Sequence, residues 1–280
     1  MKSFVDIGRT HIVGILNVTP DSFSDGGNYF SLDAAVAQAH TMAEEGADII
    51  DIGGESSRPG SEPVSEEEEL RRVIPVIEKL ARSVEVPISI DTWKPRVAAE
   101  ALAAGASILN DITGLGNPAM RAAAAAARAP VILMHMQGEP KTMQEHPTYG
   151  DVVRDIKEFF IERIALAKEA GVHDIILDPG IGFGKTLEHN LIILKRLHEF
   201  ADLGYPLLVG PSRKAFIGTL NDGAPPAERL PGTIAAVVAA RLNGASYVRV
   251  HDVKECRQAL QVADALRTAH VRDSVRDPGP

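Results

Sequence analysis

Short runs of apolar residues recur along the chain, and each run ends in a polar residue that precedes a segment of helical character. The runs are rich in Ile, Val and Leu, and they lie at residues 13–16, 49–52, 88–90, 108–109, 131–134, 175–177, 207–209 and 247–250. Nearly continuous apolar runs of this length are typical of parallel strands that are buried on both faces. The pattern therefore predicts eight buried strands.

The segments between these runs predict helices, the strongest at residues 33–45, 120–128, 151–170, 188–200, 234–243 and 253–269. A further helix is expected to begin after Ser65, where four glutamates follow a residue that favours the N-cap. We interpret this acidic run as a solvated helix start rather than a metal site. Glycines 46, 105, 171 and 244 each precede a predicted strand and are expected to supply the left-handed turn that ends a helix.

Eight strand–helix units without a break in composition predict one α/β domain, a closed (β/α)8 TIM barrel, over residues 1–270. An open doubly wound sheet is the alternative. Residues 2–8 are expected to form a short N-terminal hairpin that closes the bottom of the barrel. Residues 271–280 are expected to form a flexible C-terminal tail.

Composition narrows the class of protein. The net charge of −9 argues against a nucleic-acid partner, which requires a surplus of Lys and Arg on one face. No apolar run reaches the length of a membrane span, and the N-terminus has no apolar signal core, so no membrane partner is expected. Cys256 is the only cysteine, which excludes an intrachain disulfide and predicts a reduced, cytoplasmic setting.

Polar residues at the ends of the predicted strands are the first candidates for a site, because the active site of such a barrel lies at the carboxyl ends of its strands. They are Asn17, Asp91, Asn110, Asp178, Lys214, Arg249 and His251. The alternative is that polar residues end strands simply because loops are solvated. Since several of these residues are charged, we favour a site over that alternative.

Two loops add to this set. Residues 17–27 form a long, glycine-ended segment that suits a mobile lid, and residues 54–60 carry Arg58 at their centre. Together with Lys214, Arg249 and His251, Arg58 can surround a phosphate-bearing ligand. The carboxylates and the amide at the other strand ends can face a flat heterocycle with adjacent N–H donors. The sequence thus predicts one pocket with a cationic half and a carboxylate and amide half.

Three further features carry weaker chemistry. Residues 180–186 resemble a nucleotide-binding P-loop, but the first glycine is one residue too close to Gly184-Lys185-Thr186. His135, at a strand end between two methionines, is either a buried structural histidine or a ligand. Cys256 is expected to be packed and without chemistry. An aldolase that forms a Schiff base at Lys214 is also conceivable on a barrel, but the carboxylates across the pocket do not favour it.

Seven stretches of the chain, in order, resemble the dihydropteroate synthase family. They are residues 14–27, 51–60, 89–92, 110–112, 178–185, 212–214 and 249–251, and the resemblance extends from about residue 11 to about residue 252. It implies a transferase of folate biosynthesis and a sulfonamide target. The enzyme condenses 6-hydroxymethyl-7,8-dihydropterin diphosphate with p-aminobenzoate, giving 7,8-dihydropteroate and pyrophosphate. It also implies a homodimer formed through the later helices of the barrel.

The resemblance implies a pterin-binding role for five residues. Asp178 is expected to pair with the 2-amino group and N3–H of the pterin, as a carboxylate pairs with a guanidine-like edge. Asn110 and Asp91 are expected to bind other edges of the ring, and Met134 to line the same slot. Lys214 is expected to contact the ring carbonyl and N5.

The resemblance also implies the residues around the leaving group and the second substrate. Arg249 is expected to lie against the pterin face and to reach the phosphates, with His251 also on the pyrophosphate. Asn17 is expected to bind Mg²⁺, a hard cation that accompanies pyrophosphate. Phe183 is expected to help form the p-aminobenzoate pocket. Five loop residues are expected to close over the reacting centre: Ser57, Arg58, Pro59, Phe23 and Asp25.

Two positions depart from the family pattern. Ser57 stands where threonine is usual, and Ala215 stands where many members have a serine near the p-aminobenzoate carboxylate. Both put the details of the p-aminobenzoate pocket in doubt. Two rival functions stay open at this point: a pterin-binding methyltransferase domain that serves a corrinoid partner, and a non-catalytic relative that binds pterin. The loop residues and Lys214 argue against both.

Overall fold

The computed structural model describes residues 8–19, 28–56 and 61–269. Its strands are β1 His11–Asn17, β2 Ile49–Gly53, β3 Ile88–Asp91, β4 Ile108–Asp111, β5 Val131–Met134, β6 Ile175–Asp178, β7 Leu208–Val209 and β8 Tyr247–Val250. Its α-helices are α1 Asn28–Glu44, α2 Glu66–Leu80, α3 Pro95–Ala104, α4 Pro118–Ala127, α5 Val152–Glu169, α6 Leu187–Lys195, α7 Ala215–Leu220, α8 Leu230–Leu242 and α9 Val253–Thr268. The predicted tail and, apart from Gly8, the predicted N-terminal hairpin lie outside the described residues.

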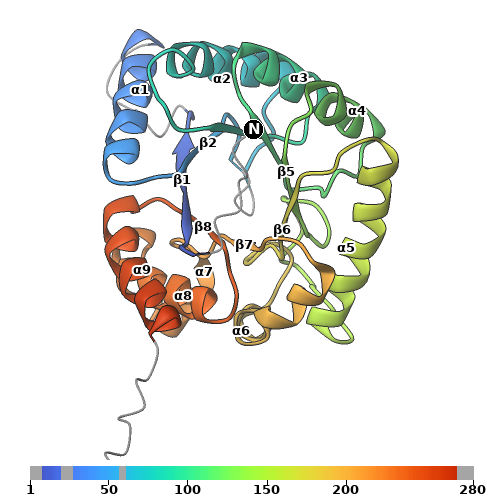
Figure 1. Ribbon diagram of the computed structural model, residues 1–280, viewed down its shortest axis with the longest axis vertical. Helices are drawn as coiled ribbons and strands as arrows, with labels where there is room; N and C mark the ends of the chain where they lie inside the picture. The colour runs from blue at the N-terminus through green and yellow to red at the C-terminus, as the bar shows by residue number, and fades with distance from the viewer. Residues whose placement is uncertain (1–7, 20–27, 57–60, 270–280) are drawn as a thin grey trace, which may run out of the picture.

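All eight strands are parallel and follow the order β6-β5-β4-β3-β2-β1-β8-β7. The ring closes between its two ends through a parallel bridge from Leu177 to Leu207, where Leu177 N donates to Pro206 O at 2.9 Å. The helices surround the strands (Figure 1). The predicted TIM barrel is confirmed, and the open sheet is wrong.

Local signals account for most element ends, with one exception. Ser65 caps α2, and the glycines at 46, 105, 171 and 244 have φ values of 101°, 127°, 89° and 110°. The helix predicted over 188–200 is wrong as a single element, because α6 ends at Lys195 and a 3-10 helix, η2 Leu197–Leu203, follows. Arg196 stands at the break, where its φ of −103° departs from helical values. Its guanidinium donates to the carboxylates of Glu199 and Asp151.

The interior of the barrel is filled by one apolar layer: Val13, Ile49, Ile108, Ile132, Ile176, Leu208 and Tyr247. Side chains alternate along a strand, so a residue two positions further toward the carboxyl end points the same way. From five members of this layer that step leads to polar or ligand-type side chains at the top of the barrel: Asp51, Asn110, Met134, Asp178 and Arg249. The apolar layer therefore closes the barrel below these side chains.

The opposite, N-terminal end of the barrel carries a compact ionic network. Asp48 accepts hydrogen bonds from Arg9 at 2.5 Å, from Arg257 at 2.5 Å and from the Ile12 N–H at 2.8 Å. Asp264 accepts from Thr10 and from Arg241. Although burial opposes it, hydrogen bonds to His11, Ile12 and Arg9 hold the pKa of Asp48 well below its usual range. Within the described ranges, no helix combines the length and the apolarity needed to cross a membrane.

Candidate active site

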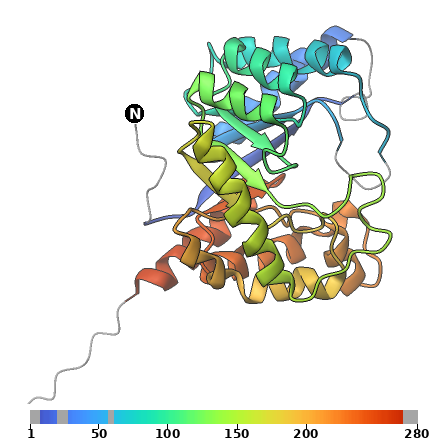
Figure 2. The ribbon, with the colours of Figure 1, turned by 90° about the vertical axis from the view of Figure 1, so that its right-hand side faces the viewer.

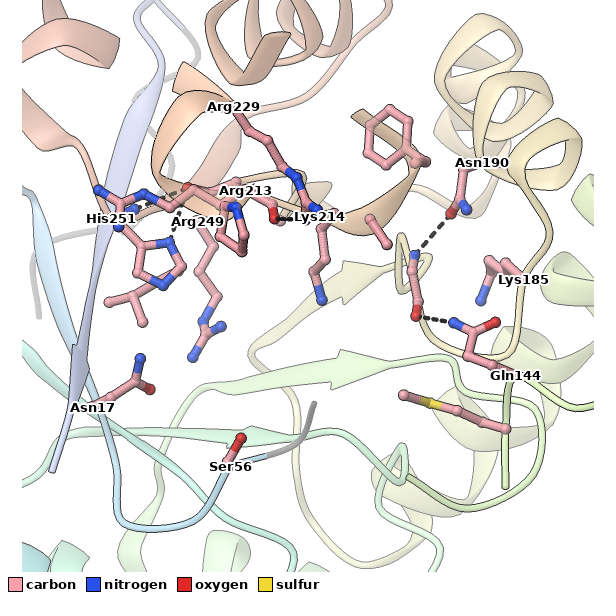
Figure 3. A pocket seen from close by; sticks show the side chains of 18 of the residues that line it. Asn17, Ser56, Gln144, Lys185, Asn190, Arg213, Lys214, Arg229, Arg249 and His251 are labelled. Atoms are coloured by element: carbon pink, nitrogen blue, oxygen red, sulfur yellow. Dashed lines mark hydrogen bonds between the residues drawn. The ribbon is translucent and has the colours of Figure 1, made fainter. Parts of the chain in front are cut away.

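A cavity of about 770 Å³ lies at the carboxyl ends of the strands, the end that faces right in Figure 2. Five predicted site residues line it together: Asn17, Asp91, Lys214, Arg249 and His251. Figure 3 shows Lys214 and Arg249 extending into the same space, with His251 and Asn17 near Arg249. The described charged residues of its wall are mostly cationic: Lys185, Arg213, Lys214, Arg229 and Arg249, against Glu55 and Asp91. A protein of negative net charge thus lines this cavity with more cationic than anionic side chains.

Arg249 lies between two carboxylates in the floor of the cavity. Its Nε donates to Oδ2 of Asp51 at 2.6 Å, and its Nη2 donates to Oδ2 of Asp91 at 2.6 Å. The same Asp51 oxygen accepts from the Asn110 amide at 3.1 Å. Asp51 is fully buried, and among the described residues its Oδ1 has no hydrogen-bond partner. Asp51 therefore orients both Arg249 and Asn110, a role that the sequence reasoning missed.

Two buried carboxyl groups at this end of the barrel, Asp91 and Asp178, have raised pKa values. Burial raises the pKa of Asp91 to about 7, although the Arg249 guanidinium favours the charged form. Burial also raises the pKa of Asp178 to about 6, against the stabilising Gly180 N–H, which donates to Oδ1 at 2.8 Å, and against Lys214 and Arg249. Strongly shifted groups in a cavity are typical of functional sites. The floor is thus prepared for a ligand that brings hydrogen-bond donors.

Lys214 reaches the cavity from a segment with a fixed backbone. The preceding Arg213 has φ +57°, and its guanidinium binds the Asp252 carboxylate through two nitrogens. Arg229 donates to the Arg213 carbonyl at 2.9 Å. The Lys214 ammonium lies 3.9 Å from the centroid of the Phe183 ring. This is a cation–π contact, which places a charge beside an aromatic face.

His251 and the base of the β2–α2 loop are also fixed by side-chain contacts. His251 Nδ1 lies 3.0 Å from the Ser212 hydroxyl.

Lys94 bridges the buried carboxylates of Glu55 and Glu69 at 2.5 Å each. Glu55 also accepts from the Val64 N–H at 2.9 Å. These contacts fix both stems of the loop that joins β2 to α2.

The remaining predicted site residues divide into two groups. Four are buried next to the cavity rather than lining it: Asn110, Met134, Asp178 and Phe183. Met134 and Phe183 pack in one apolar cluster with Ile112 and Met143. Five fall outside the described residues: Phe23, Asp25, Ser57, Arg58 and Pro59. Their roles stay predictions.

The P-loop-like segment does not use its lysine as a P-loop does. Lys185 is buried, and its Nζ lies 2.9 Å from the Phe183 carbonyl and 3.0 Å from His135 Nδ1. Thr186 caps α6 through its hydroxyl. His135 is buried in this contact, in line with its structural interpretation, and Cys256 is buried as expected.

Comparisons with known proteins agree with this geometry. A family model described as "Pterin binding enzyme" matches residues 13–251. The dihydropteroate synthase of Escherichia coli strain K12 is 53% identical over 268 residues, which cover 95% of this chain and 94% of that protein. A structure of the Yersinia pestis synthase with a sulfonamide drug complex matches with TM-score 0.90 and 49% identity, covering 95% of this chain and 97% of that one. A Xanthomonas albilineans synthase in complex with 7,8-dihydropteroate matches with TM-score 0.85 and 44% identity, covering 95% and 97%.

Proposed function

Because the chain belongs to the dihydropteroate synthase family of pterin-binding enzymes, we propose that it condenses 6-hydroxymethyl-7,8-dihydropterin diphosphate with p-aminobenzoate. The products are 7,8-dihydropteroate and pyrophosphate. The observation that carries the proposal is the cationic cavity wall above buried carboxylates, since this substrate has an anionic diphosphate at one end and a ring rich in N–H donors at the other. The relatives that match almost the whole chain are synthases, which outweighs the methyltransferase interpretation.

The pterin ring is proposed to bind at the buried carboxylates. Asp178 keeps one oxygen on the Gly180 N–H and offers acceptor capacity to the 2-amino group and N3–H. Asn110 and Asp91 would bind further ring edges, Met134 would contact the ring from β5, and Lys214 would contact the ring carbonyl and N5. Binding donors to these carboxylates favours their ionised forms, so the ligand itself compensates part of their desolvation.

The diphosphate is proposed to bind at the cationic wall. Arg249 and His251 lie on the same side of the cavity as Asn17, and Arg58 would join them from the β2–α2 loop. The carboxamide oxygen of Asn17 suits Mg²⁺, and no group of three or more acidic, His or Cys ligands occurs among the described residues. Such a sparse donor set fits a cation that takes most of its ligands from water and substrate phosphates. When bound, Mg²⁺ would neutralise charge on the leaving pyrophosphate.

The chemistry requires stabilisation of a leaving group rather than a nucleophilic side chain. The methylene carbon is attached to an electron-rich pterin and can support positive charge, so loss of pyrophosphate can precede attack by the amine. Arg249, His251 and Arg58 would stabilise the departing oxygens by fixed charges and hydrogen bonds. The arylamine is unprotonated at neutral pH and needs no strong general base. Positioning of the amine supplies the rest.

The p-aminobenzoate ring is proposed to lie at Phe183 and Lys214, where an aromatic face stands beside an ammonium. A benzoate has the complementary pair of features, a ring and a carboxylate. The backbone amides around Ala215 would contribute to carboxylate binding, because Ala215 lines the cavity but has no hydroxyl. Phe23, Asp25, Ser57 and Pro59 are proposed to close over both substrates.

A homodimer in the cytoplasm is proposed as the working form. Exposed leucines occur on three successive helices, Leu191 on α6, Leu220 on α7 and Leu242 on α8, with exposed fractions of 41%, 55% and 50%. A shared apolar surface on these helices would be covered by a second copy. The single buried thiol is suited to a reducing compartment.

The test is pyrophosphate release from the pterin diphosphate with Mg²⁺, run with and without p-aminobenzoate. We expect 7,8-dihydropteroate to form only when both substrates are present. Tight binding of the pterin substrate without release of pyrophosphate, in the presence of p-aminobenzoate, would contradict the proposal. That result would favour the methyltransferase-like or the non-catalytic alternative.

A further inference from the structure

Lys185 joins two loops at the carboxyl ends of neighbouring strands. Its Nζ contacts the Phe183 carbonyl at 2.9 Å, His135 Nδ1 at 3.0 Å and, more weakly, the His135 carbonyl at 3.5 Å. His135 directly follows β5, whereas Phe183 and Lys185 belong to the segment between β6 and α6. One buried ammonium therefore connects the β5 end to the β6–α6 segment.

This lysine is placed where its charge is costly. None of the three acceptors is a carboxylate, and the residue is only 3% exposed. Burial, opposed by Asp178 and reinforced by Lys214, lowers the pKa of Lys185 to about 7. An apolar side chain of similar length would fill the space without the desolvation cost. The hydrogen bonds of Lys185 are thus the property that an apolar replacement would not supply.

The two joined segments also pack against each other at backbone level. A Cβ on Gly180 would lie 1.9 Å from the His135 carbonyl oxygen, and a Cβ on Gly184 would lie 2.3 Å from the Gln137 carbonyl oxygen. Gln144 donates to the Gly182 carbonyl at 2.6 Å, and a dashed line marks this contact at Gln144 in Figure 3. Two carbonyl groups of the segment from 180 to 184 therefore accept side-chain hydrogen bonds. Gln144 of the β5–α5 loop donates to one of them, and Lys185 donates to the other.

That segment carries Phe183 and borders the side chain of Lys214. The Phe183 carbonyl is a Lys185 acceptor, and the Phe183 ring contacts the Lys214 ammonium. A Cβ on Gly182 would lie 3.0 Å from Lys214 Cδ, so the lysine stem passes closely over the same backbone. A shift of the β6–α6 segment would move the Phe183 ring, whereas Lys214 is held at its own backbone by the contacts of Arg213.

We propose that Lys185 is a positioning residue: its hydrogen bonds to Phe183 and His135 fix the β6–α6 segment, and through it the Phe183 ring, for the second, aromatic substrate. The inference rests on the proposed function, because it requires p-aminobenzoate to bind at Phe183. It assigns a role to a lysine whose sequence context resembles a phosphate-binding loop but whose ammonium contacts the protein itself.

The test compares two lysines that are ten residues apart in the chain. Lys185→Met removes the ammonium and keeps an unbranched side chain, and Lys195→Met does the same at an exposed position at the end of α6. Steady-state kinetics are measured with each substrate varied in turn. We expect Lys185→Met to raise KM for p-aminobenzoate about tenfold, with kcat and KM for the pterin diphosphate within about threefold. Lys195→Met is expected to match the wild type.

His135 provides a second pair of variants that leaves Lys185 in place. His135→Asn keeps an acceptor near the position of Nδ1, and His135→Leu removes it. We expect His135→Leu to raise KM for p-aminobenzoate and His135→Asn to restore most of the wild-type value. The double variant of Lys185→Met with His135→Leu is expected to match Lys185→Met alone, because Lys185→Met already removes the one contact that His135→Leu breaks. If Lys185→Met does not fold, this pair decides the question.

Two results would overturn the inference while leaving the proposed function intact. One is an unchanged KM for p-aminobenzoate in folded Lys185→Met protein. The other is an equal loss of affinity for both substrates together with a lower melting temperature, which indicates a merely structural lysine. Absence of product formation by the wild-type chain would instead overturn the proposed function, and the inference with it.

Discussion

The pKa values of carboxyl groups are shifted in opposite directions at the two ends of this barrel. At the N-terminal end, Asp48 has hydrogen-bond donors on both oxygens, and its pKa is lowered. At the carboxyl end, burial raises the pKa of Asp91 to about 7 and that of Asp178 to about 6. Arginines accompany the carboxylates at both ends, so the presence of a cation does not explain the difference.

The difference lies in burial, since Asp48 is only half-buried, and in how many donors each carboxylate already has. The contacts of Asp48 come from Arg9, Arg257 and a backbone N–H, whereas Asp178 receives the Gly180 N–H and only longer-range attraction from lysine and arginine. A carboxylate with unused acceptor capacity in a buried place costs stability until a ligand supplies donors. The carboxylate at the N-terminal end thus stabilises the fold. The carboxylates at the carboxyl end lower the stability of the free protein and favour binding of a ligand that donates hydrogen bonds.

Asp178→Asn tests the carboxyl end of this comparison and has the largest expected effect. The amide retains an acceptor for the Gly180 N–H but presents N–H groups to the N–H donors of the pterin. We expect kcat/KM to fall about a thousandfold, because a site that loses a matched hydrogen-bond partner rejects its ligand strongly. The measurement is product formation with both substrates, with circular dichroism as the check on folding.

The same variant is expected to be more stable than the wild type when no ligand is bound. A carboxyl whose folded pKa is raised contributes stability below its unfolded pKa and loses that contribution as pH rises through the folded pKa. For Asp178 the window runs from 3.8 to about 6, so the ionised form costs up to about 3 kcal/mol at pH 8. We expect Asp178→Asn to melt a few degrees higher at pH 8, with the advantage gone near pH 4. A lower melting temperature at pH 8 would contradict the comparison.

Asp51 lies at the carboxyl end but is expected to act only through Arg249 and Asn110. Asp51→Ala removes the acceptor of both residues, and Asp51→Asn retains an acceptor oxygen without its charge. We expect kcat/KM to fall about a hundredfold in the first variant and about tenfold in the second, since charge-assisted hydrogen bonds are roughly twice as strong as neutral ones. Equal activity in both variants and the wild type, measured by product formation, would remove Asp51 from the site.

Asp48→Asn tests the N-terminal end and is expected to change stability alone. Loss of the charge beside Arg9 and Arg257 should cost about 2 kcal/mol at pH 7, measured by urea unfolding. Because the folded pKa of Asp48 is lowered, its contribution is present above 3.8 and lost as pH falls further, so the difference should narrow in acid. Activity at 25 °C should stay within twofold of the wild type. A large loss of activity in folded protein would show that the two ends are coupled.

The fold was predictable because each strand is a short run made mostly of apolar residues, and the turn glycines stand a few residues before the next strand. The prediction of one helix over residues 188–200 was wrong. Arg196, at the break, binds Asp151 at the N-terminus of α5, a contact between residues 45 apart in the chain. Pattern along the chain carries no information about such a partner. The predicted hairpin, lid and tail residues lie outside the described residues, and their roles stay predictions.

The site was partly predictable for a related reason. Residues at strand ends were found by position, but Asp51 was missed because it lies within the predicted strand at residues 49–52 rather than at its end. Counting in steps of two from Ile49, in the apolar layer, places Asp51 inside the barrel level with Asn110 and Arg249. The burial of Lys185 was not predictable by counting, because it depends on acceptors from a neighbouring loop.

Ala215→Ser has the smallest expected effect and sharpens the comparison at the rim of the cavity. Ala215 is the first residue of α7, follows Lys214 and lines the cavity, so a hydroxyl there can reach a carboxylate held by Lys214 without disturbing the buried acids. We expect KM for p-aminobenzoate to fall about threefold, the contribution of one exposed hydrogen bond, while kcat, pterin binding and melting temperature stay constant. Steady-state kinetics with p-aminobenzoate varied is the measurement, and the same substitution at an exposed position of α3, Ala99→Ser, is the control. An unchanged KM would place the carboxylate of the second substrate away from α7. The charged floor of the cavity and Lys214 would then account for binding of p-aminobenzoate, and position 215 would not contribute.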